Sequence, residues 1–265
     1  MQIGKAGPPV SRIARAYPDR VEVRGRDLCG DLVGRLTFTE YFHLLLMGSE
    51  PTDDQRFFLD ALLVSIAEHG LMPTNVAARM TLAADPGSLQ GAVAAGILGC
   101  GPVVLGTAEE CAMLLEEMQA RVASGASPDA AAAEAARTAH AAGEKLPGFG
   151  HPVHRPVDPR AERILELADA RGVSGPHVLL ARGLHDAAAS EWGKPLTMNV
   201  SMPIAAVLLD LGFPATTAKA VPILARTAGL LAHLAEEREQ PLGFLLAGKA
   251  EEAVSYEPPG REGAR

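Results

Sequence analysis

The sequence predicts an all-α protein. Polar residues able to cap a helix precede apolar residues at helical spacing along most of the chain, and short turns containing glycine or proline separate these segments. Alanine is abundant and aromatic residues make up only 4% of the 265 residues, a composition that favours closely packed helices. No run typical of a parallel strand is present. A chain of this length can form one large domain, or a main domain with a smaller lobe.

The first part of the chain combines one short alternating stretch with capped helices. Residues 20–25 alternate between apolar and charged side chains, which predicts a short β-hairpin. Thr37 and Thr52 are each followed three residues later by glutamate or glutamine, which is the spacing of a capping box. We therefore expect helices to begin at these two threonines, and the second helix to continue to His69.

Helices and turns also account for the middle of the chain. Two alanine-rich helices are expected between residues 109 and 145, with a turn at 123–128. Asp158 followed by Pro159 is typical of an N-cap and the first helical position, so another helix should begin there. A further helix is expected over residues 177–189.

The last part of the chain predicts two more helices and a polar end. Residues 204–211 indicate a helix, and Ser201 is expected to cap it. A long amphipathic helix follows, with Thr216 or Thr217 as its expected cap. Residues 250–265 are polar, and we expect them to be frayed.

Residues 146–160 cannot form a helix, because this stretch contains two glycines and four prolines. We expect a loop of defined shape that holds its side chains in fixed positions. His151 offers a titratable imidazole, and Arg155 and Arg160 offer cations for carboxylate or phosphate groups. The glycines allow a ligand to approach the backbone amides.

These residues resemble the signature loop of the citrate synthase superfamily, which includes citryl-CoA lyases and the C-terminal part of ATP citrate lyase. The resemblance covers Leu-Pro-Gly-Phe-Gly-His at 146–151, Arg155, and Asp-Pro-Arg at 158–160. It implies that His151 is a catalytic acid, that Arg155 contacts a phosphate of coenzyme A, and that Arg160 binds a substrate carboxylate. It also implies that a run of backbone holds the adenine of coenzyme A: Leu146, Pro147, Gly148, Phe149 and Gly150.

Other segments resemble the family in the same order along the chain. Residues 44–52 reproduce its Leu-Leu-Leu-x-Gly-x-x-Pro-Thr turn, and residues 67–70 align with its Ala-Asp-His segment. The resemblance implies that His69 belongs to the catalytic site and contacts the carboxylate substrate. Arg226 begins a segment similar to the family's Arg-x-x-Gly-x-x-Ala-His element, which implies that it also binds a substrate carboxylate. A buried arginine needs an anion nearby in any case, either a carboxylate of the protein or a ligand.

Two residues depart from the family's pattern. Val104 stands where the family has a histidine that stabilises the thioester enolate, a change that ATP citrate lyase shares. Ser201 stands where the family has its catalytic aspartate, in the segment Asn-Val-Ser at 199–201. A serine cannot act as a carboxylate base at neutral pH. Either another residue replaces this base, for which His185 or Asp186 are candidates, or the reaction has changed.

Two classes of function follow. The first is a citryl-CoA lyase-like enzyme that cleaves or forms the carbon–carbon bond of a 3-hydroxy-polycarboxylyl-CoA, such as citryl-CoA, to give an acyl-CoA and a 2-oxo acid. In that reaction, a histidine near its ordinary pKa can exchange the proton of a carbinol oxygen. The alternative is a citrate synthase-like protein that binds an acyl-CoA or a polycarboxylate without this chemistry. A thioesterase with Ser201 as nucleophile is a third possibility, but no Gly-x-Ser-x-Gly elbow supports it.

The expected architecture is a large helical domain with a smaller helical lobe inserted into it. We expect residues 1–106 and 212–265 to form the large domain, and residues 107–211 to form a lobe that binds coenzyme A. Residues 86–108 are rich in glycine and alanine and fit a buried helix interface, so a homodimer or higher homo-oligomer is expected. Phe244 lies near the place where the resemblance implies an arginine that completes the partner subunit's site.

Composition excludes several other roles. A net charge of −8 argues against nucleic acid and anionic membrane surfaces as partners. Cys29, Cys100 and Cys111 have neither metal-site spacing nor a disulfide pattern, so we expect no metal centre and free thiols in a reducing compartment. The first nine residues have no apolar core of signal-peptide length, and we expect a cytoplasmic protein. The coenzyme A thioester is expected as a substrate, with no tightly bound cofactor.

Overall fold

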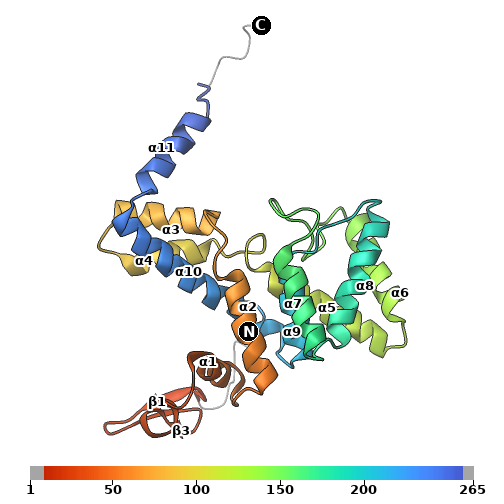
Figure 1. Cartoon of the computed structure of the whole chain (residues 1–265), viewed down its shortest axis with the longest axis horizontal. Helices are drawn as coiled ribbons and strands as arrows, with labels where there is room; N and C mark the ends of the chain where they lie inside the picture. The colour runs from red at the N-terminus through yellow and green to blue at the C-terminus, as the bar shows by residue number, and fades with distance from the viewer. Residues whose placement is uncertain (1–8, 259–265) are drawn as a thin grey trace.

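The computed structural model describes residues 9–258. Of the nine residues considered for a signal peptide, 1–8 lie outside this range. Residues 259–265 of the segment predicted to be frayed also lie outside it. Within the described residues the fold is helical, apart from one small sheet near the N-terminus (Figure 1). The predicted all-α class is therefore confirmed.

The small sheet is antiparallel, with strand order β1-β2-β3. Its strands are β1 (Ala14–Ala16), β2 (Val21–Val23) and β3 (Arg26–Asp27), and a short π-helical turn, η1 (Leu28–Leu32), follows. The predicted hairpin at residues 20–25 corresponds to β2 and the turn into β3, and β1 adds a third strand. Val23, Leu32 and Leu44 form a small hydrophobic core that joins the sheet to the first helix.

Eleven α-helices and a short 3-10 turn make up the rest of the described chain. They are α1 (Phe38–Met47), α2 (Asp53–Ala67), α3 (Pro73–Ala84), α4 (Leu89–Leu98), α5 (Thr107–Ala123), α6 (Pro128–Ala141), α7 (Pro159–Ala170), α8 (Pro176–Glu191), α9 (Ser201–Asp210), η2 (Ala215–Thr217), α10 (Ala220–Glu239) and α11 (Gly243–Ala253). Both predicted capping boxes are present, at Thr37 and at Thr52. Asp158 caps α7 as predicted, because its side chain accepts the N–H of Arg160.

Three predicted helix ends were wrong. Ser201 is the first residue of α9 rather than its cap, because the side chain of Asn199 accepts the N–H of Ser201 in its place. Thr217 belongs to η2, where its hydroxyl donates to the carbonyl of Pro214, and α10 begins after Lys219 without a side-chain cap. The second helix ends at Ala67, and His69 lies beyond its C-cap.

The described end of the chain is also more ordered than predicted. Residues 250–253, which the sequence suggested would be frayed, form the last turn of α11. This helix projects away from the body of the molecule, and its contacts there are made mainly with α3 (Figure 1). Phe244 and Leu245 at its base are exposed.

The helices fall into two groups on either side of α2 (Figure 1). Helices α5 to α9 pack against one another, and α3, α4 and α10 form the second group. Helix α9 is central to the first group, since residues 201–209 are all buried. The main hydrophobic core includes Phe58 and Leu62 of α2 as well as α5, α8 and α9, so α2 joins the two groups. The boundary predicted at residues 107 and 211 stays a prediction.

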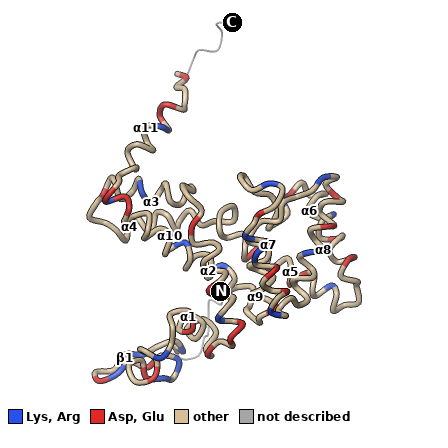
Figure 2. The backbone as a smooth tube through the Cα atoms, viewed as in Figure 1, with Lys and Arg blue, Asp and Glu red and all other residues tan. Residues whose placement is uncertain are grey.

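Residues of both charges occur along the whole described chain and are intermixed (Figure 2). Basic and acidic residues alternate even in the small N-terminal sheet. No helix between residues 9 and 258 has both the length and the apolar character needed to cross a membrane.

Candidate active site

The glycine-rich loop is fixed by the segment that leads into α9. Phe149 and Met198 form an isolated antiparallel bridge. The N–H of Gly150 donates to the carbonyl of Thr197 at 2.7 Å, and the N–H of Asn199 donates to the carbonyl of Gly148 at 2.8 Å. The Asn199 side chain adds a hydrogen bond to the carbonyl of Gly150 at 3.0 Å. The two segments that carry the family resemblance therefore hold each other in place.

Gly148 is required at its position for two reasons. Its φ of +81° lies in the left-handed region that favours glycine. A Cβ atom there would lie 2.8 Å from the Cys111 sulfur and 2.9 Å from Met202, closer than side chains pack. The loop therefore lies directly on α5 and α9, and a side chain at this residue would displace it.

Asp158 anchors the other end of the loop. This fully buried carboxylate accepts hydrogen bonds from Arg160 Nε at 3.0 Å, from Arg160 Nη2 at 2.8 Å and from the backbone N–H of Val200 at 3.1 Å. Burial raises the pKa of Asp158, but the hydrogen bonds and charge of Arg160 outweigh it, and the net pKa is lowered. Asp158 is therefore an ionised structural anchor that holds Arg160 beside the start of α9.

A cleft of about 780 Å³ opens along the loop. Its lining includes all five backbone residues predicted to hold adenine, Leu146 to Gly150, together with His151 and Arg155. Leu146 and Gly148 are buried, whereas Arg155 is exposed. The structure thus brings the predicted coenzyme A residues together around one cavity, with a cation at its edge.

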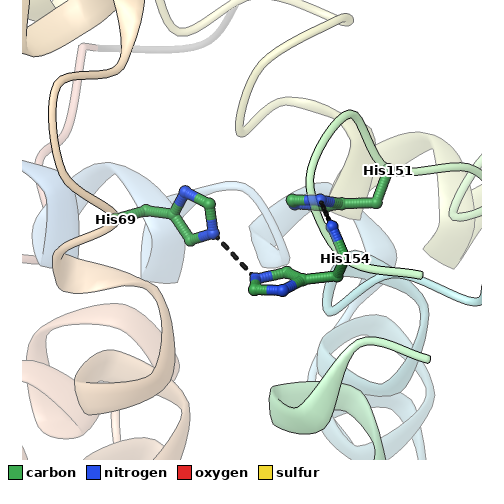
Figure 3. Close-up of side chains that lie close together, drawn as sticks. All are labelled: His69, His151 and His154. Atoms are coloured by element: carbon green, nitrogen blue, oxygen red, sulfur yellow. Dashed lines mark hydrogen bonds between the residues drawn. The ribbon is translucent and has the colours of Figure 1, made fainter. Parts of the chain in front are cut away.

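Three histidines lie close together (Figure 3), and one of them, His151, lines this cleft. His69 comes from the segment after α2, and His151 and His154 come from the loop. The Nε2 atoms of His69 and His154 are 2.9 Å apart, and the rings of His151 and His154 are stacked with centroids 4.4 Å apart. The centroids of His69 and His151 are 5.3 Å apart. Two of the three were predicted as site residues, and His154 was not.

Both predicted histidines are neutral at pH 7. Burial, together with the charge of His154, lowers the pKa of His151 to about 4. Burial is also the largest cause of the lowered pKa of His69, followed by the charge of Arg160. The expectation of an imidazole near its ordinary pKa was therefore wrong for His151, because solvent is partly excluded and cationic groups lie nearby.

Arg226 is a buried guanidinium, with a relative exposed surface of 3%. Its Nη1 donates to the Asn75 side-chain oxygen at 3.1 Å and its Nη2 to the carbonyl of Ile66 at 3.3 Å. Its Nε is buried without a hydrogen-bond partner among the described residues. Burial lowers the pKa of Arg226, which the negative charge of Glu68 partly offsets. Among residues 9–258 no carboxylate forms a hydrogen bond with Arg226, so the expected anion is left to a ligand.

A network of hydrogen bonds and ion pairs fixes Arg226 and the segment that carries His69. Asn75 accepts from Arg226 and donates to the carbonyl of Gly70 at 2.7 Å. Its amide nitrogen also lies 2.8 Å from His233 Nε2. The fully buried Arg79 forms an ion pair with Glu237 at 2.8 Å and a hydrogen bond with His233. Sequence reasoning gave neither Asn75 nor Arg79 a role, because their partners Arg226, His233 and Glu237 lie about 150 positions away.

The residues at the departures from the family pattern lie as follows. Val104 packs against the main core in the tight turn before α5. Ser201, with 8% of its surface exposed, begins α9 next to the anchor of Asp158. His185 stacks on Phe149, and its Nε2 lies 2.9 Å from the carbonyl of Leu196, whereas Asp186 is exposed on α8. Hydrogen bonding thus engages His185, and among the described residues neither His185 nor Asp186 forms a hydrogen bond with the three histidines.

The family model for the C-terminal domain of citrate synthase matches residues 13–243. The chain belongs to the citrate synthase family. His69, the loop and Arg226, on which the family resemblance was based, lie close together in the fold.

Comparison with known proteins places this family member near both synthases and lyases. It is 32% identical over 199 residues to a putative citrate synthase 2 of Mycobacterium bovis, an alignment covering 72% of this chain and 50% of that protein. It therefore spans about half the length of the curated relatives it matches.

Solved structures match over more of the chain. The citryl-CoA lyase of Hydrogenobacter thermophilus superposes with a TM-score of 0.83 at 30% identity, covering 96% of this chain and 97% of that one. An ATP citrate lyase of Methanothrix soehngenii, solved with citrate and coenzyme A, has a TM-score of 0.74 at 18% identity and covers 98% of this chain and 43% of that one. The second match shows the fold alone. The predicted citrate synthase-like fold is confirmed.

Proposed function

We propose that this protein is a citryl-CoA lyase-like enzyme that cleaves or forms the carbon–carbon bond of a 3-hydroxy-polycarboxylyl-CoA, such as citryl-CoA. The products of cleavage are an acyl-CoA and a 2-oxo acid. The observation that carries this proposal is Arg226, a buried cation from which no carboxylate between residues 9 and 258 accepts a hydrogen bond. It lies in the same site as neutral histidines, of which His151 lines the cleft. The correspondence with a citryl-CoA lyase over nearly the whole of both chains supports the reaction class.

The polycarboxylate part of the substrate would bind between Arg226 and Arg160. Guanidinium groups hold carboxylates through charge-assisted, often bidentate, hydrogen bonds. Arg226 has a free buried Nε, and Arg160 is already fixed in orientation by Asp158. Charges of both arginines lower the pKa of His69, so the site is a positive one and suits a ligand with several carboxylates.

The coenzyme A part would bind along the cleft, in a lobe formed by residues 107–211. Leu146 to Gly150 offer bare backbone beside a cavity of about 780 Å³, which is within the size range of small-molecule sites. Arg155 lies exposed at the cleft, where a phosphate can reach it. We propose His151 as a hydrogen-bond donor to the carbinol oxygen, and His69 as a contact of the same substrate.

A second function is favoured by Ser201. The residue at the position of the family's aspartate is a nearly buried hydroxyl, and the nearby carboxylate of Asp158 is committed to Arg160 and Val200. If no other group moves the proton, the protein would hold an acyl-CoA or a polycarboxylate without cleaving it.

A panel of CoA thioesters, including citryl-CoA, separates these functions when incubated with the protein and analysed for free acyl-CoA and 2-oxo acid. Cleavage of one member is expected. Arg155→Ala should weaken binding of that thioester by about 10- to 100-fold, because a charge-assisted hydrogen bond contributes roughly 1.5–3 kcal/mol. Arg163→Ala, an exposed arginine on α7 that pairs with Glu166, is the matched control and should leave binding unchanged.

Two results would change the proposal. Tight binding of coenzyme A and citrate without cleavage of any thioester would favour the binding protein. Arg155→Ala with unchanged affinity, and with an unchanged dependence of binding on salt, would mean that the loop does not hold coenzyme A phosphate.

A further inference from the structure

His154 is a titratable group to which the proposed reaction gives no role. It lies in the loop three residues after His151 and is half-buried between two other imidazoles (Figure 3). Its Nε2 is 2.9 Å from that of His69, and its ring stacks on that of His151. The hydrogen bonds of the three rings determine which of their nitrogens can accept a proton.

His151 has no nitrogen free to take up a proton. Its Nδ1 accepts the backbone N–H groups of Val153 at 3.1 Å and of His154 at 2.9 Å. A neutral imidazole carries one proton, so these two contacts place the proton of His151 on Nε2. Arg160 Nη2 lies 3.4 Å from that atom and, being a donor as well, forms no hydrogen bond with it in this tautomer. This N–H can donate to a substrate oxygen, and the pKa of about 4 keeps the ring neutral while it does so. His151 therefore stabilises a developing negative charge but cannot serve as the base.

His69 and His154 together can serve as the base. Their Nε2 atoms are close enough for one hydrogen bond, which requires a proton on one of the two and a lone pair on the other. The accepting ring then carries its own proton on Nδ1, and the donating ring has a free lone pair on Nδ1. The pair thus holds one basic nitrogen in its neutral form, and a proton taken up there is shared with a second ring.

We propose that the His69–His154 pair takes the carbinol proton in carbon–carbon cleavage and delivers it to the carbon next to the thioester, where the family's missing carboxylate would act. The step rests on the proposed function. The O–H bond breaks towards the pair, the oxygen becomes a carbonyl, and the electrons of the broken carbon–carbon bond pass to the carbon next to the thioester. That carbon receives the proton that the pair took up, so the reaction needs no oxidant, reductant or further reactant.

Substrate binding should strengthen this base. The charged and titratable groups around the pair come from the loop, from α7, from α10 and from the end of α2. They are His151, Asp158, Arg160, Arg226 and Glu68. The two arginines lower the pKa of His69, and carboxylates bound to them would cancel part of their charge. The pair is then more basic with substrate bound than without it.

The same three rings offer ligand atoms within 4.8 Å of one another, which is the geometry of a possible metal site. The local charge opposes a dication, because Arg160 Nη2 lies 3.4 Å from His151 Nε2 and Arg226 lies in the same site. The Nε2 atoms of His69 and His154 also already form a hydrogen bond. Proton transfer therefore fits the arrangement better than metal binding.

The test compares the steady-state cleavage of citryl-CoA, or of the thioester the panel identifies, by the parent and by His154→Gln. We expect kcat to fall by about 10²- to 10⁴-fold with little change in KM, the loss typical of a general base. In the parent, the acid limb of kcat/KM should lie below pH 6.5, because burial and Arg160 lower the pKa of His69. The acid limb of kcat should lie at higher pH than that of kcat/KM. Both limbs should disappear or move in the variant, and added imidazole should partly restore His154→Ala.

A structural measurement completes the test. Long-range ¹⁵N–¹H spectra of the histidine rings should show His151 protonated on Nε2 alone from pH 5 to 8. A proton on its Nδ1 would overturn the assignment of the His151 tautomer. Loss of activity in a chelator, restored by zinc with one ion bound per chain, would overturn proton transfer in favour of a metal site. Cleavage by the parent that His154→Gln leaves undiminished, with the same pH profile, overturns this inference alone. Absence of cleavage by the parent overturns it together with the proposed function.

Discussion

Arg226 shows how the burial of one charged side chain favours a particular kind of ligand. It is a guanidinium with 3% of its surface exposed, held by an amide oxygen and a backbone carbonyl rather than by a carboxylate. Burying a charge that no carboxylate hydrogen-bonds costs free energy, and the nearby charge of Glu68 offsets this cost only in part. A carboxylate ligand would recover that free energy on binding.

Replacing Arg226 should therefore separate stability from binding. In Arg226→Met we expect a melting temperature equal to or above that of the parent without ligand, because the buried charge is gone and its stem is replaced by a similar apolar one. Citrate affinity should fall by about 10- to 100-fold, the loss of a charge-assisted hydrogen bond. Thermal unfolding and calorimetry with citrate measure the two effects.

The matched control is Arg182→Met, which removes an exposed arginine of α8 that pairs with Asp169. It should change neither the melting temperature nor the affinity for citrate beyond about 0.5 kcal/mol. A large loss of stability in Arg226→Met with citrate binding intact would show that the arginine is structural.

At the scale of elements, the site depends on how the loop, α7 and α9 are joined. Gly148 and Gly150 pair with the segment 197–199, and Asp158 links the first turn of α7 to the N–H of Val200. These contacts bring His151 and Arg160 to one place without a continuous secondary-structure element between them. The carboxylate of Asp158 is thus at the junction of three elements.

Asp158→Asn should be strongly destabilising. It breaks a buried ion pair and leaves the guanidinium of Arg160, only 19% exposed, without its partner, for a cost of about 3–5 kcal/mol. The pKa of Asp158 is lower in the folded protein than its unfolded value of 3.8. The ionised carboxylate therefore stabilises the fold at every pH above 3.8, and this stabilisation is lost as the pH falls through the folded pKa. The difference between parent and variant should therefore persist from pH 5 to 8 in urea unfolding.

Asp169→Asn is the control on the same helix. Asp169 also pairs with an arginine, Arg182, but both side chains are largely exposed. Such a pair contributes about 0–1 kcal/mol, so the unfolding midpoint should hardly change. Equal losses in the two variants would contradict the role given to the buried pair.

At the scale of the whole molecule, several large apolar side chains are exposed on the surface of the single chain. Leu98 at the end of α4 and Val103 in the following turn are each 86% exposed, and Phe244 at the base of the projecting α11 is 75% exposed (Figure 1). Leu98 and Val103 lie in the glycine- and alanine-rich segment for which an interface is predicted. Large exposed apolar side chains are common on surfaces that another chain covers, which is compatible with the predicted homodimer.

We expect the protein to sediment with the mass of two chains at micromolar concentration. Leu98→Glu should shift it towards the mass of one chain, because a carboxylate would have to be buried in the interface. Met113→Glu, at an exposed position on α5 outside that segment, should leave the dimer intact. A parent that sediments as one chain would contradict the predicted homodimer.

The sequence by itself predicted most of the secondary structure and several residues of the candidate site. Capping boxes at Thr37 and Thr52 and the Asp158–Pro159 pair specify helix starts through contacts within three residues, so they could be found by local reasoning. The caps expected at Ser201 and Thr217 are not formed. The Asn199 side chain accepts the N–H of Ser201 at the start of α9, and Thr217 lies within the 3-10 turn η2 before α10. The site residues His69, His151 and Arg226 were found through the resemblance to a family.

Only the tertiary structure decided the chemistry these residues can perform. The hydrogen bond between His69 and His154 joins positions 85 apart, and the contact of Arg226 with Asn75 joins positions 151 apart. Whether Arg226 has a counter-ion, which nitrogen of His151 carries a proton, and how far its pKa falls depend on burial and on charges brought in from other elements. Burial and electrostatic fields are properties of the packed molecule, so no pattern of neighbouring residues contains them.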